Sequence, residues 1–325
     1  MTLRWGILGT ARINRRVIPA IGLARRSELV AVASRDRARA EAYARDWSVP
    51  RAIAGYQALL DDSSLDAIYI PLPNTDHVPW TLAAIAAGKH VLCEKPLALD
   101  PRDVDRIAAA AAAARVVVEE GFMYRHEPLT ARVAALVEDG AIGAPQTVVS
   151  GFTFSLEADH NIRLNPALGG GSLWDVGCYP VTYAQLIAGS EPTMVSGTAL
   201  WHQSGVDEEF TGLLRFVGGM TANIFSGFRA AHRTWLEIRG SHGGLTVPNP
   251  FRPGPIETLE VERNGAIERI AVAGSPEIFV REIEDFEASV LDGAAPVVTL
   301  AESRRTAATL AKLYAAARDG RPVAP

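Results

Sequence analysis

The sequence predicts two domains of different class, an α/β domain with a doubly wound parallel sheet and an α+β domain with a large, mostly antiparallel, open-faced sheet. Short apolar runs alternate with helical segments up to about residue 122, whereas long runs of alternating apolar and polar residues begin near residue 144. The 325 residues also exceed one ordinary domain. We therefore expect domains at 1–122 and 123–325, with the C-terminal helix free to pack back on the first.

The first domain is predicted from buried strands separated by helices. Runs rich in Val, Ile and Leu predict strands at Leu3–Gly9, Glu28–Ser34, Leu65–Leu72, Lys89–Cys93 and Val116–Phe122. Amphipathic or alanine-rich stretches predict helices at Ile13–Ala24, Ala38–Asp46, Trp80–Ala87 and Val104–Ala114. A further helix, Glu127–Asp139, ends at Gly140 and leads out of this domain.

The second domain is predicted from period-two patterns and turn signals. Expected strands are Gln146–Phe154, Val195–Trp201, Phe210–Phe216, Met220–Phe228, Trp235–Gly240 and Thr258–Val261, and expected helices are Val176–Ile187, Ile278–Leu291 and Leu300–Arg318. The strands carry apolar side chains such as Phe210, Phe216, Phe225 and Phe228. If helices pack on only one face of this sheet, the other face needs a partner to cover it. We therefore expect a homodimer or homotetramer formed through this sheet.

Composition narrows the class of protein. Hydrophobic residues make up 48% of the chain and charged residues 21%, as in a globular enzyme. The formal net charge of −5 gives no electrostatic case for nucleic-acid or anionic-membrane partners. A strand begins at the N-terminus with no room for a signal peptide, and two cysteines suit a reducing compartment, so we expect a cytoplasmic protein. The histidines His160, His202, His232 and His242 lack metal-ligand spacing, so no metal is expected.

A phosphate-binding loop is predicted between the first strand and the first helix. The segment reads Gly9, Thr10, Ala11, Arg12 and Ile13. In the Rossmann pattern the first glycine makes the tight turn, whereas here Ala11 and Asn14 replace the second and third glycines. Helix N-terminal amides still hold pyrophosphate, and alanine adds only a methyl group. The loop therefore predicts a dinucleotide site.

The end of the second strand predicts which dinucleotide binds. Sites for NAD usually place an acid there to bind the ribose 2′-hydroxyl, but this chain has Ser34 and Arg35, and an arginine receives a 2′-phosphate. Arg39, one turn along the next helix, adds a second cation, while Asp36 is placed to cap that helix. We expect NADP(H) as the cofactor, with NAD(H) as the alternative. If Arg35 has no role in cofactor binding, it is simply a solvent-exposed side chain.

Lys95 is the most informative residue of the predicted crevice. Only three lysines occur among the 32 basic residues, and this one follows Glu94 at the end of a strand, where ligands bind in open α/β sheets. A lysine pKa falls readily on desolvation, unlike that of arginine, so it suits proton chemistry. Cofactor contacts are also expected from Glu94 and from the segment after the fourth strand, at Pro71, Leu72, Asn74 and His77. Asn74 and His77 either touch the ribose or cap the next helix.

Three segments together resemble the Gfo/Idh/MocA oxidoreductases, a family that includes glucose–fructose oxidoreductase and inositol dehydrogenase. They are 4–13 (RWGILGTARI), the triplet Glu94-Lys95-Pro96, and 169–179 (GGGSLWDVGCY). The likeness spans nearly the whole chain. It implies a Rossmann domain, a C-terminal domain with an open-faced sheet often used for oligomerisation, and hydride exchange between a nicotinamide and the carbinol carbon of a sugar or polyol.

The resemblance implies that Lys95 is the catalytic group beside the nicotinamide and that Asp175 is the acid of the glycine-rich motif. Tyr179 stands where many inositol dehydrogenase-like members have histidine, a pattern similar to NADP-dependent xylose dehydrogenases and dimeric dihydrodiol dehydrogenase. A phenol pKa of about 10 is lowered by a nearby ammonium. We assign Tyr179 as acid/base, Lys95 as the donor that tunes it, and Asp175 as an acceptor for the lysine or sugar, although exchanged roles for Lys95 and Tyr179 fit equally well.

Further substrate contacts are expected from residues near these motifs, namely Tyr124, Arg125, His126, Arg163 and Trp174. The predicted function is an NADP-dependent aldose 1-dehydrogenase of the xylose or glucose type. Reduction of keto-sugars or oxidation of trans-dihydrodiols is the alternative within the same chemistry. A cofactor-binding regulator without turnover is the alternative of a different class.

Overall fold

The computed structural model describes residues 1–157, 161–321 and 323, so His160 lies outside the described residues. The chain divides into two compact units, which are residues 1–126 with 277–304, and residues 127–276 with 305–325. The first unit thus includes the segment 277–304 in addition to the N-terminal residues. The chain passes between the units three times, and the third passage, between Arg304 and Arg305, falls within the long helix α9 (Leu300–Asp319).

The first unit is built on a six-stranded sheet in the order β3-β2-β1-β4-β5-β6, with every neighbouring pair parallel. The strands are β1 (Leu3–Leu8), β2 (Ser27–Ser34), β3 (Arg51–Ala54), β4 (Ala67–Ile70), β5 (His90–Glu94) and β6 (Val118–Gly121). The order reverses beside β1, at the topological switch point where open α/β sheets bind ligands. The expected doubly wound sheet is confirmed.

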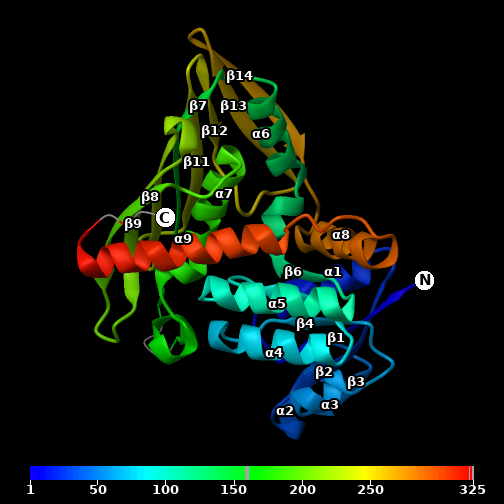
Figure 1. The fold of residues 1–325 in the computed structure, drawn as a ribbon. Coiled ribbons are helices and arrows are strands. Elements are labelled where there is room, and N and C mark those ends of the chain that lie inside the picture. The colour runs from blue at the N-terminus through cyan, green and yellow to red at the C-terminus, as the bar shows by residue number, and fades with distance from the viewer. Residues whose placement is uncertain (158–160, 322, 324–325) are drawn as a thin grey trace. The chain divides into compact units, whose positions relative to one another are not determined.

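Helices flank this sheet, with α4 and α5 side by side (Figure 1). They are α1 (Asn14–Leu23), α2 (Arg37–Asp46), α3 (Tyr56–Leu60), α4 (Asn74–Ala86), α5 (Pro101–Ala114), the 3₁₀ turn η1 (Met123–His126) and α8 (Phe279–Leu291). Helix α5 shows why such segments form, since Asp100 accepts a hydrogen bond from the Arg102 amide at 2.9 Å and alanines follow. Helix α8 joins this unit because Phe286 lies 5.1 Å from the Trp5 ring of β1.

The second unit contains an eight-stranded sheet in the order β14-β13-β12-β11-β7-β10-β9-β8, in which only the β7–β10 pair is parallel. The strands are β7 (Pro145–Thr153), β8 (Met194–Trp201), β9 (Asp207–Arg215), β10 (Thr221–Gly227), β11 (Arg233–Gly240), β12 (Gly243–Val247), β13 (Ile256–Arg263) and β14 (Ala266–Ala273). The expected mostly antiparallel sheet is thus confirmed, although β12 and β14 were not anticipated.

One face of this sheet, the inner face, packs against helices. Helix α7 (Cys178–Ala188) lies on β7 and β10, and α6 (Pro128–Glu138) lies beside α7 and β14. Of the four phenylalanines expected to need a covering partner, Phe210, Phe216 and Phe228 are instead buried in the unit's own core. Only Phe225 lies half-buried on the opposite face. The expectation for the other three was therefore wrong, because strand alternation sends them inward.

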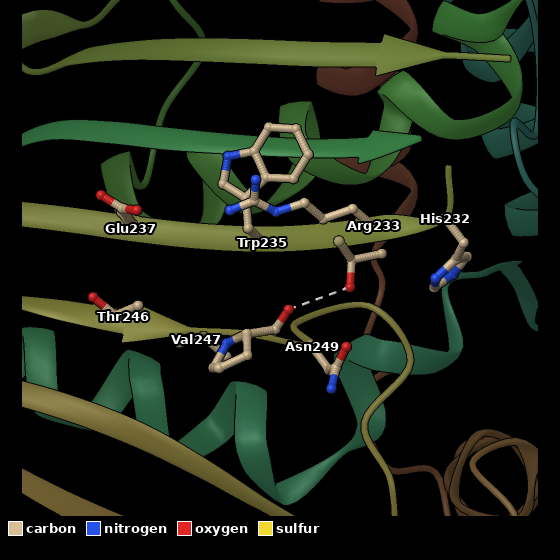
Figure 2. A pocket seen from close by; sticks show the side chains of 9 residues that line it. His232, Arg233, Trp235, Glu237, Thr246, Val247 and Asn249 are labelled. Carbon is tan, nitrogen blue, oxygen red and sulfur yellow. Dashed lines mark hydrogen bonds between the residues drawn. The ribbon is translucent and has the colours of Figure 1, made fainter. Parts of the chain in front are cut away.

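The opposite face, here called the outer face, carries side chains that none of the helices described for this unit covers. Val149, Leu213, Phe225 and Trp235 project from it at half-buried positions of β7, β9, β10 and β11. The Trp235 indole lies over Gly151, its direct partner across the strand pair, where any Cβ would collide with the ring. A pocket of about 380 Å³ opens beside it, bordered by Arg233, Trp235 and Glu237 of β11 and Thr246 of β12 (Figure 2).

Candidate functional site

The loop after β1 has the geometry of a phosphate-binding turn. Gly9 has a φ of 103°, a conformation that favours glycine, and a Cβ there would meet Leu72 Cδ2 at 3.0 Å. Asn14 occupies the place of the third glycine at the start of α1 and is completely buried. Its Nδ2 donates to the Gly9 carbonyl oxygen at 2.9 Å, so the asparagine closes the loop by a hydrogen bond. Thr10, Ala11, Arg12 and Ile13 form the exposed or half-buried part of the turn before α1.

Cationic side chains gather where β1 and β2 end. Arg39 donates from Nε to Thr10 Oγ1 at 2.7 Å, and Asp36 caps α2 by accepting from the Arg39 amide at 2.7 Å. Arg35 is exposed directly after Ser34. Burial raises the pKa of Tyr56, at the start of α3, while Arg35 and Arg39 both act to lower it, so the two guanidinium groups flank this phenol. Tyr56 was missed by the sequence reasoning, since only the fold brings β3 beside β2.

Residues of the first unit hold the loop that carries Lys95 in place. Glu94, the last residue of β5, accepts a hydrogen bond from Tyr69 Oη at 2.6 Å. His77 is completely buried in α4, with Nδ1 2.8 Å from the Pro96 carbonyl oxygen and Nε2 2.7 Å from that of Leu72. Burial lowers the His77 pKa. These contacts favour a positioning role for His77 rather than a ribose contact, while Pro71 is buried and Asn74 begins α4.

A buried acid completes the support of this loop. Glu120 of β6 accepts a hydrogen bond from the Leu97 amide at 2.8 Å and is 1% exposed. Burial raises the Glu120 pKa, whereas the positive charge of Lys95 lowers it. The Lys95 ammonium and the Glu120 carboxyl therefore interact electrostatically. Glu120 was not a sequence candidate, although two consecutive acids in an apolar strand were a usable signal.

The residues that follow β6 pack inside the first unit. Tyr124 is fully buried, and Arg125 donates to Glu302 Oε1 at 2.8 Å. His126 lies with Nδ1 2.8 Å from Asp285 Oδ2 and Nε2 3.6 Å from Glu119 Oε1. Arg125 and His126 thus each have an acidic partner inside their own unit. This pattern favours a structural role over the expected sugar contacts.

In the second unit the structure brings together Arg163 and Asp175. Arg163 donates from Nε to Asp175 Oδ2 at 2.5 Å, and its guanidinium lies 5.7 Å from the Phe154 ring centroid. The glycine-rich loop brings Arg163 close to Asp175, because the Gly171 amide donates to the Arg163 carbonyl oxygen at 2.8 Å. Asp175 was expected to fix the lysine or the sugar, and its pairing with Arg163 is an addition that sequence spacing did not reveal.

Asp175 and Tyr179 do not lie in one regular helix. Asp175 lies in a π-helical turn, Leu173–Gly177, and Tyr179 lies in the first turn of α7. The Tyr179 ring is 5.4 Å from Phe152 and 5.3 Å from Phe251, which leaves it 3% exposed in an aromatic wall. Trp174 stacks on Tyr314 of α9 at 5.3 Å. An apolar wall of this kind disfavours charge on the phenol unless a cation compensates.

Within residues 1–157, 161–321 and 323, no group of three or more His, Cys, Asp and Glu side chains is arranged to hold a metal ion. No helix in the same part of the chain is long and apolar enough to cross a bilayer.

The phosphate turn, the switch point and the lysine at the end of β5 define a nicotinamide-dependent oxidoreductase. Comparison with known proteins agrees. Residues 3–122 match the model of an oxidoreductase family with an NAD-binding Rossmann fold, Gfo/Idh/MocA, and residues 130–246 match a C-terminal domain of the same family. The chain belongs to the Gfo/Idh/MocA family, which confirms the resemblance seen in the sequence.

Several relatives match over nearly their whole length. The chain is 38% identical to a D-xylose 1-dehydrogenase (NADP(+)) of Haloferax volcanii, covering 99% of both chains. It is 33% identical to a dTDP-3,4-didehydro-2,6-dideoxy-α-D-glucose 3-reductase of Actinomadura kijaniata, covering 98% of this chain and 96% of that protein. A solved 3-ketoreductase from Actinomadura kijaniata, in complex with NADP and TDP-benzene, superposes with a TM-score of 0.92 at 31% identity, covering 97% and 98% of the two chains.

Proposed function

We propose that this protein is an NADP(H)-dependent sugar oxidoreductase that acts as an aldose 1-dehydrogenase, with the first unit binding cofactor and the second binding substrate. The observation that carries the sugar class is the full-length similarity, at 38% identity, to a D-xylose 1-dehydrogenase. The preference for NADP(H) is supported by the exposed Arg35 and by Arg39, which is held on Thr10 where a 2′-phosphate would lie.

The residues at the end of β1 and β2 fit this cofactor. The turn at Gly9 leaves no room for a Cβ against Leu72, so the backbone is free to approach a pyrophosphate closely. When bound, the nicotinamide supplies the hydride acceptor or donor. Glu94 and His77 hold the loop on either side of Lys95, which we assign to the position beside that ring.

We assign the proton transfer to Tyr179 and Lys95. Oxidation of a carbinol requires a group that takes the hydroxyl proton, and the Tyr179 phenol does so once the Lys95 ammonium lowers its pKa. Asp175, held by Arg163, accepts a hydrogen bond from the sugar or the lysine. Solved variants of the related 3-ketoreductase replace one lysine and one tyrosine, and these two are as many positions apart as Lys95 and Tyr179 are here.

A second candidate is reduction of a keto-sugar. It is favoured by the similarity to the 3-ketoreductase of Actinomadura kijaniata, whose TM-score of 0.92 shows the same backbone. The same residues serve both directions, because a phenol that takes a proton in oxidation returns it in reduction. A trans-dihydrobenzenediol dehydrogenase of Xenopus laevis, 31% identical over 77% of this chain, keeps diols among the substrates to be tested.

The deciding experiment is a turnover assay in both directions. Purified protein is incubated with NADP⁺ and a panel of aldoses, polyols and trans-diols, and separately with NADPH and keto-sugars. We expect NADP⁺ reduction with a pentose or hexose aldose. Turnover only with keto-sugars moves the assignment to the second candidate. Absence of turnover with every compound, despite tight NADPH binding, overturns the proposal in favour of a cofactor-binding regulator.

We further propose that a second copy of this chain covers the outer face of the eight-stranded sheet, giving a homodimer or homotetramer. Trp235 and Phe225, with ring centroids 6.4 Å apart, form an apolar centre there. Charged groups surround it, including Arg233, whose guanidinium lies 5.0 Å from the Trp235 ring. We place the protein in the cytoplasm, because Cys93 and Cys178 are both buried free thiols.

A further inference from the structure

The π-helical turn Leu173–Gly177 is tied to a buried acid that belongs to none of the sequence motifs. Asp207, the first residue of β9, is fully buried, and its Oδ2 accepts hydrogen bonds from Ser172 Oγ at 2.7 Å and from the Leu173 amide at 2.8 Å. Its other oxygen, Oδ1, accepts from Tyr314 Oη. One carboxylate therefore joins the start of the turn to helix α9.

The glycine-rich loop is shaped around this acid. Gly171 has a φ of 126°, and a Cβ there would collide with both Asp207 Oδ1 and Tyr314 Oη. Ser226 of β10 lies 2.9 Å from Ser172 Oγ, and a Cβ at Gly177 would meet Leu173 Cδ1 at 2.8 Å. Only glycines allow the backbone to approach this closely.

Tyr314 connects the acid to the proposed substrate side of the turn. Its hydroxyl donates to Asp207, and its ring stacks on Trp174 at 5.3 Å with an interplanar angle of 24°. Trp174 precedes Asp175, and the Asp175 amide donates to the Gly171 carbonyl oxygen at 3.1 Å. Asp207 is thus connected to Asp175 through both the backbone and the aromatic stack.

We propose that Asp207 is a positioning residue for catalysis. It holds the turn that carries Asp175 and precedes Tyr179, and the Tyr314 hydroxyl in turn holds Asp207. The inference rests on the proposed function for its kinetic consequences. Asp207 reaches no reacting group itself in this arrangement. It acts by fixing the amide of Leu173 and the hydroxyl of Ser172, from which the direction of the Asp175 side chain follows.

The charge state of Asp207 supplies a readout that a purely structural residue lacks. Burial raises its pKa to about 6, while the hydrogen bonds from Tyr314 and Ser172 lower it. The groups that face it are the Tyr314 phenol of α9, the Ser172 hydroxyl, and Ser226 of β10 behind that hydroxyl. Arg318, also on α9, lies 5.9 Å from the Tyr314 ring centroid. Because its pKa is raised, Asp207 binds a proton more tightly in the closed turn than in an open, solvated one, so the turn opens more readily as pH rises through about 6.

The test compares Asp207→Asn, Tyr314→Phe and, as the matched control on the same strand, Glu209→Gln in the full chain. Amide hydrogen exchange of the peptide covering 171–179 is measured across pH, which needs no substrate. We expect Asp207→Asn to raise exchange there about tenfold or more, with an unchanged melting temperature and no dependence on the pH window around 6. Tyr314→Phe should move the transition to higher pH, because it removes a bond that lowers the Asp207 pKa.

With an aldose and NADP⁺, we expect Asp207→Asn to lower kcat by up to about a hundredfold with little change in KM, and to remove the change in the wild-type pH–rate profile around pH 6. Glu209→Gln should match wild type in both measurements. Hydrogen exchange and a pH–rate profile that are both unchanged in Asp207→Asn would overturn the inference. If no aldose turns over but the exchange result holds, the positioning role stands and the proposed function fails.

Discussion

Lys95 stands at the end of β5 in a loop whose neighbours are fixed on both sides. Tyr69 holds Glu94 at 2.6 Å, and His77 lies 2.8 Å from the Pro96 carbonyl oxygen. A flexible lysine stem gains precision when the backbone that carries it cannot move. This arrangement explains why a lysine, rather than one of the many arginines, occupies the position, since an ammonium is a compact donor whose pKa responds to its surroundings.

Replacing Lys95 by Met is expected to lower kcat by about 10²–10⁴-fold, because the ammonium acts where proton and charge move. Binding of NADPH, measured by fluorescence titration, should change by no more than a few-fold. Tyr179→Phe should give a comparable loss, and the double variant should lose little more than either single one. Lys312→Met, which removes a lysine paired with Glu191 at 3.8 Å, serves as control. Near wild-type turnover in Lys95→Met would show that the centre is misassigned.

Cofactor preference is expected to depend on Arg35. Arg35→Asp places an acid where NAD enzymes bind the ribose 2′-hydroxyl and removes a cation that pairs with a 2′-phosphate. We expect the Kd for NADP⁺ to rise at least about tenfold while that for NAD⁺ stays level or falls. Arg45→Asp, in the last turn of the helix α2 that follows Arg35, should change neither value. Wild-type protein that binds NAD⁺ as tightly as NADP⁺ would contradict the assignment.

Residues that belong to a local motif could be predicted from the sequence, and residues joined by the fold could not. Gly9, Lys95 and Asp175 stand at strand or helix ends that the patterns located. Tyr56 and Asp207 lie outside any motif, and their roles depend on contacts across the sheet that spacing does not encode. His77 was expected to touch the ribose or to cap a helix, whereas its ring contacts two carbonyl oxygens from residues 5 and 19 positions away.

The same limit holds at the level of elements. Long strands and helices such as β7, β10 and α5 follow their periodic patterns closely. The four-residue strand β3 and the five-residue helix α3 are too short to show a period, and neither was expected. The π-helical turn was also missed, because it forms where Asp207 accepts from the Leu173 amide and not from any local propensity.

Helix α8 brings an unusual carboxyl into the first unit. Glu282 is 1% exposed, and neither of its oxygens has a hydrogen-bond partner among the described residues. Burial raises its pKa well above the ordinary value, and Glu94, Glu119 and Asp285 raise it further. The neutral acid is therefore the form that the fold favours, and ionisation at higher pH works against folding.

Glu282→Gln is expected to change the pH dependence of stability. The folded-state pKa is above the unfolded value of 4.5, so wild-type stability from this group is present at low pH and is lost as pH rises above about 4.5 toward the folded pKa. Glutamine cannot ionise, so the melting temperature of the variant relative to wild type should rise by a few degrees between pH 5 and pH 8. Glu284→Gln on the same helix should run parallel to wild type, and a parallel course for Glu282→Gln would refute this reasoning.

At the scale of the whole molecule, the outer face of the second sheet is the surface that remains to be explained. Beyond Trp235 and Phe225, it exposes Ile256 of β13 at 71% and Ile267 of β14 at 59%. These side chains alternate along their strands with Leu259 and Val261, which are buried on the inner face. The charged pairs Arg239–Glu262 and Arg269–Glu260 lie between the apolar groups of this face, an arrangement typical of an interface with an apolar centre and a polar rim.

Association through this face is expected to be broken by a single charge. Phe225→Glu places a carboxylate beside Trp235 at the apolar centre, and its desolvation in an interface would not be compensated. Multi-angle light scattering at micromolar concentration should show a dimer or tetramer for wild type and a monomer for the variant. Val217→Glu is the control, because Val217 is 75% exposed in the turn after β9 rather than on the sheet face. A monomeric wild type would refute the interface, whereas a variant that stays associated would place it on another surface.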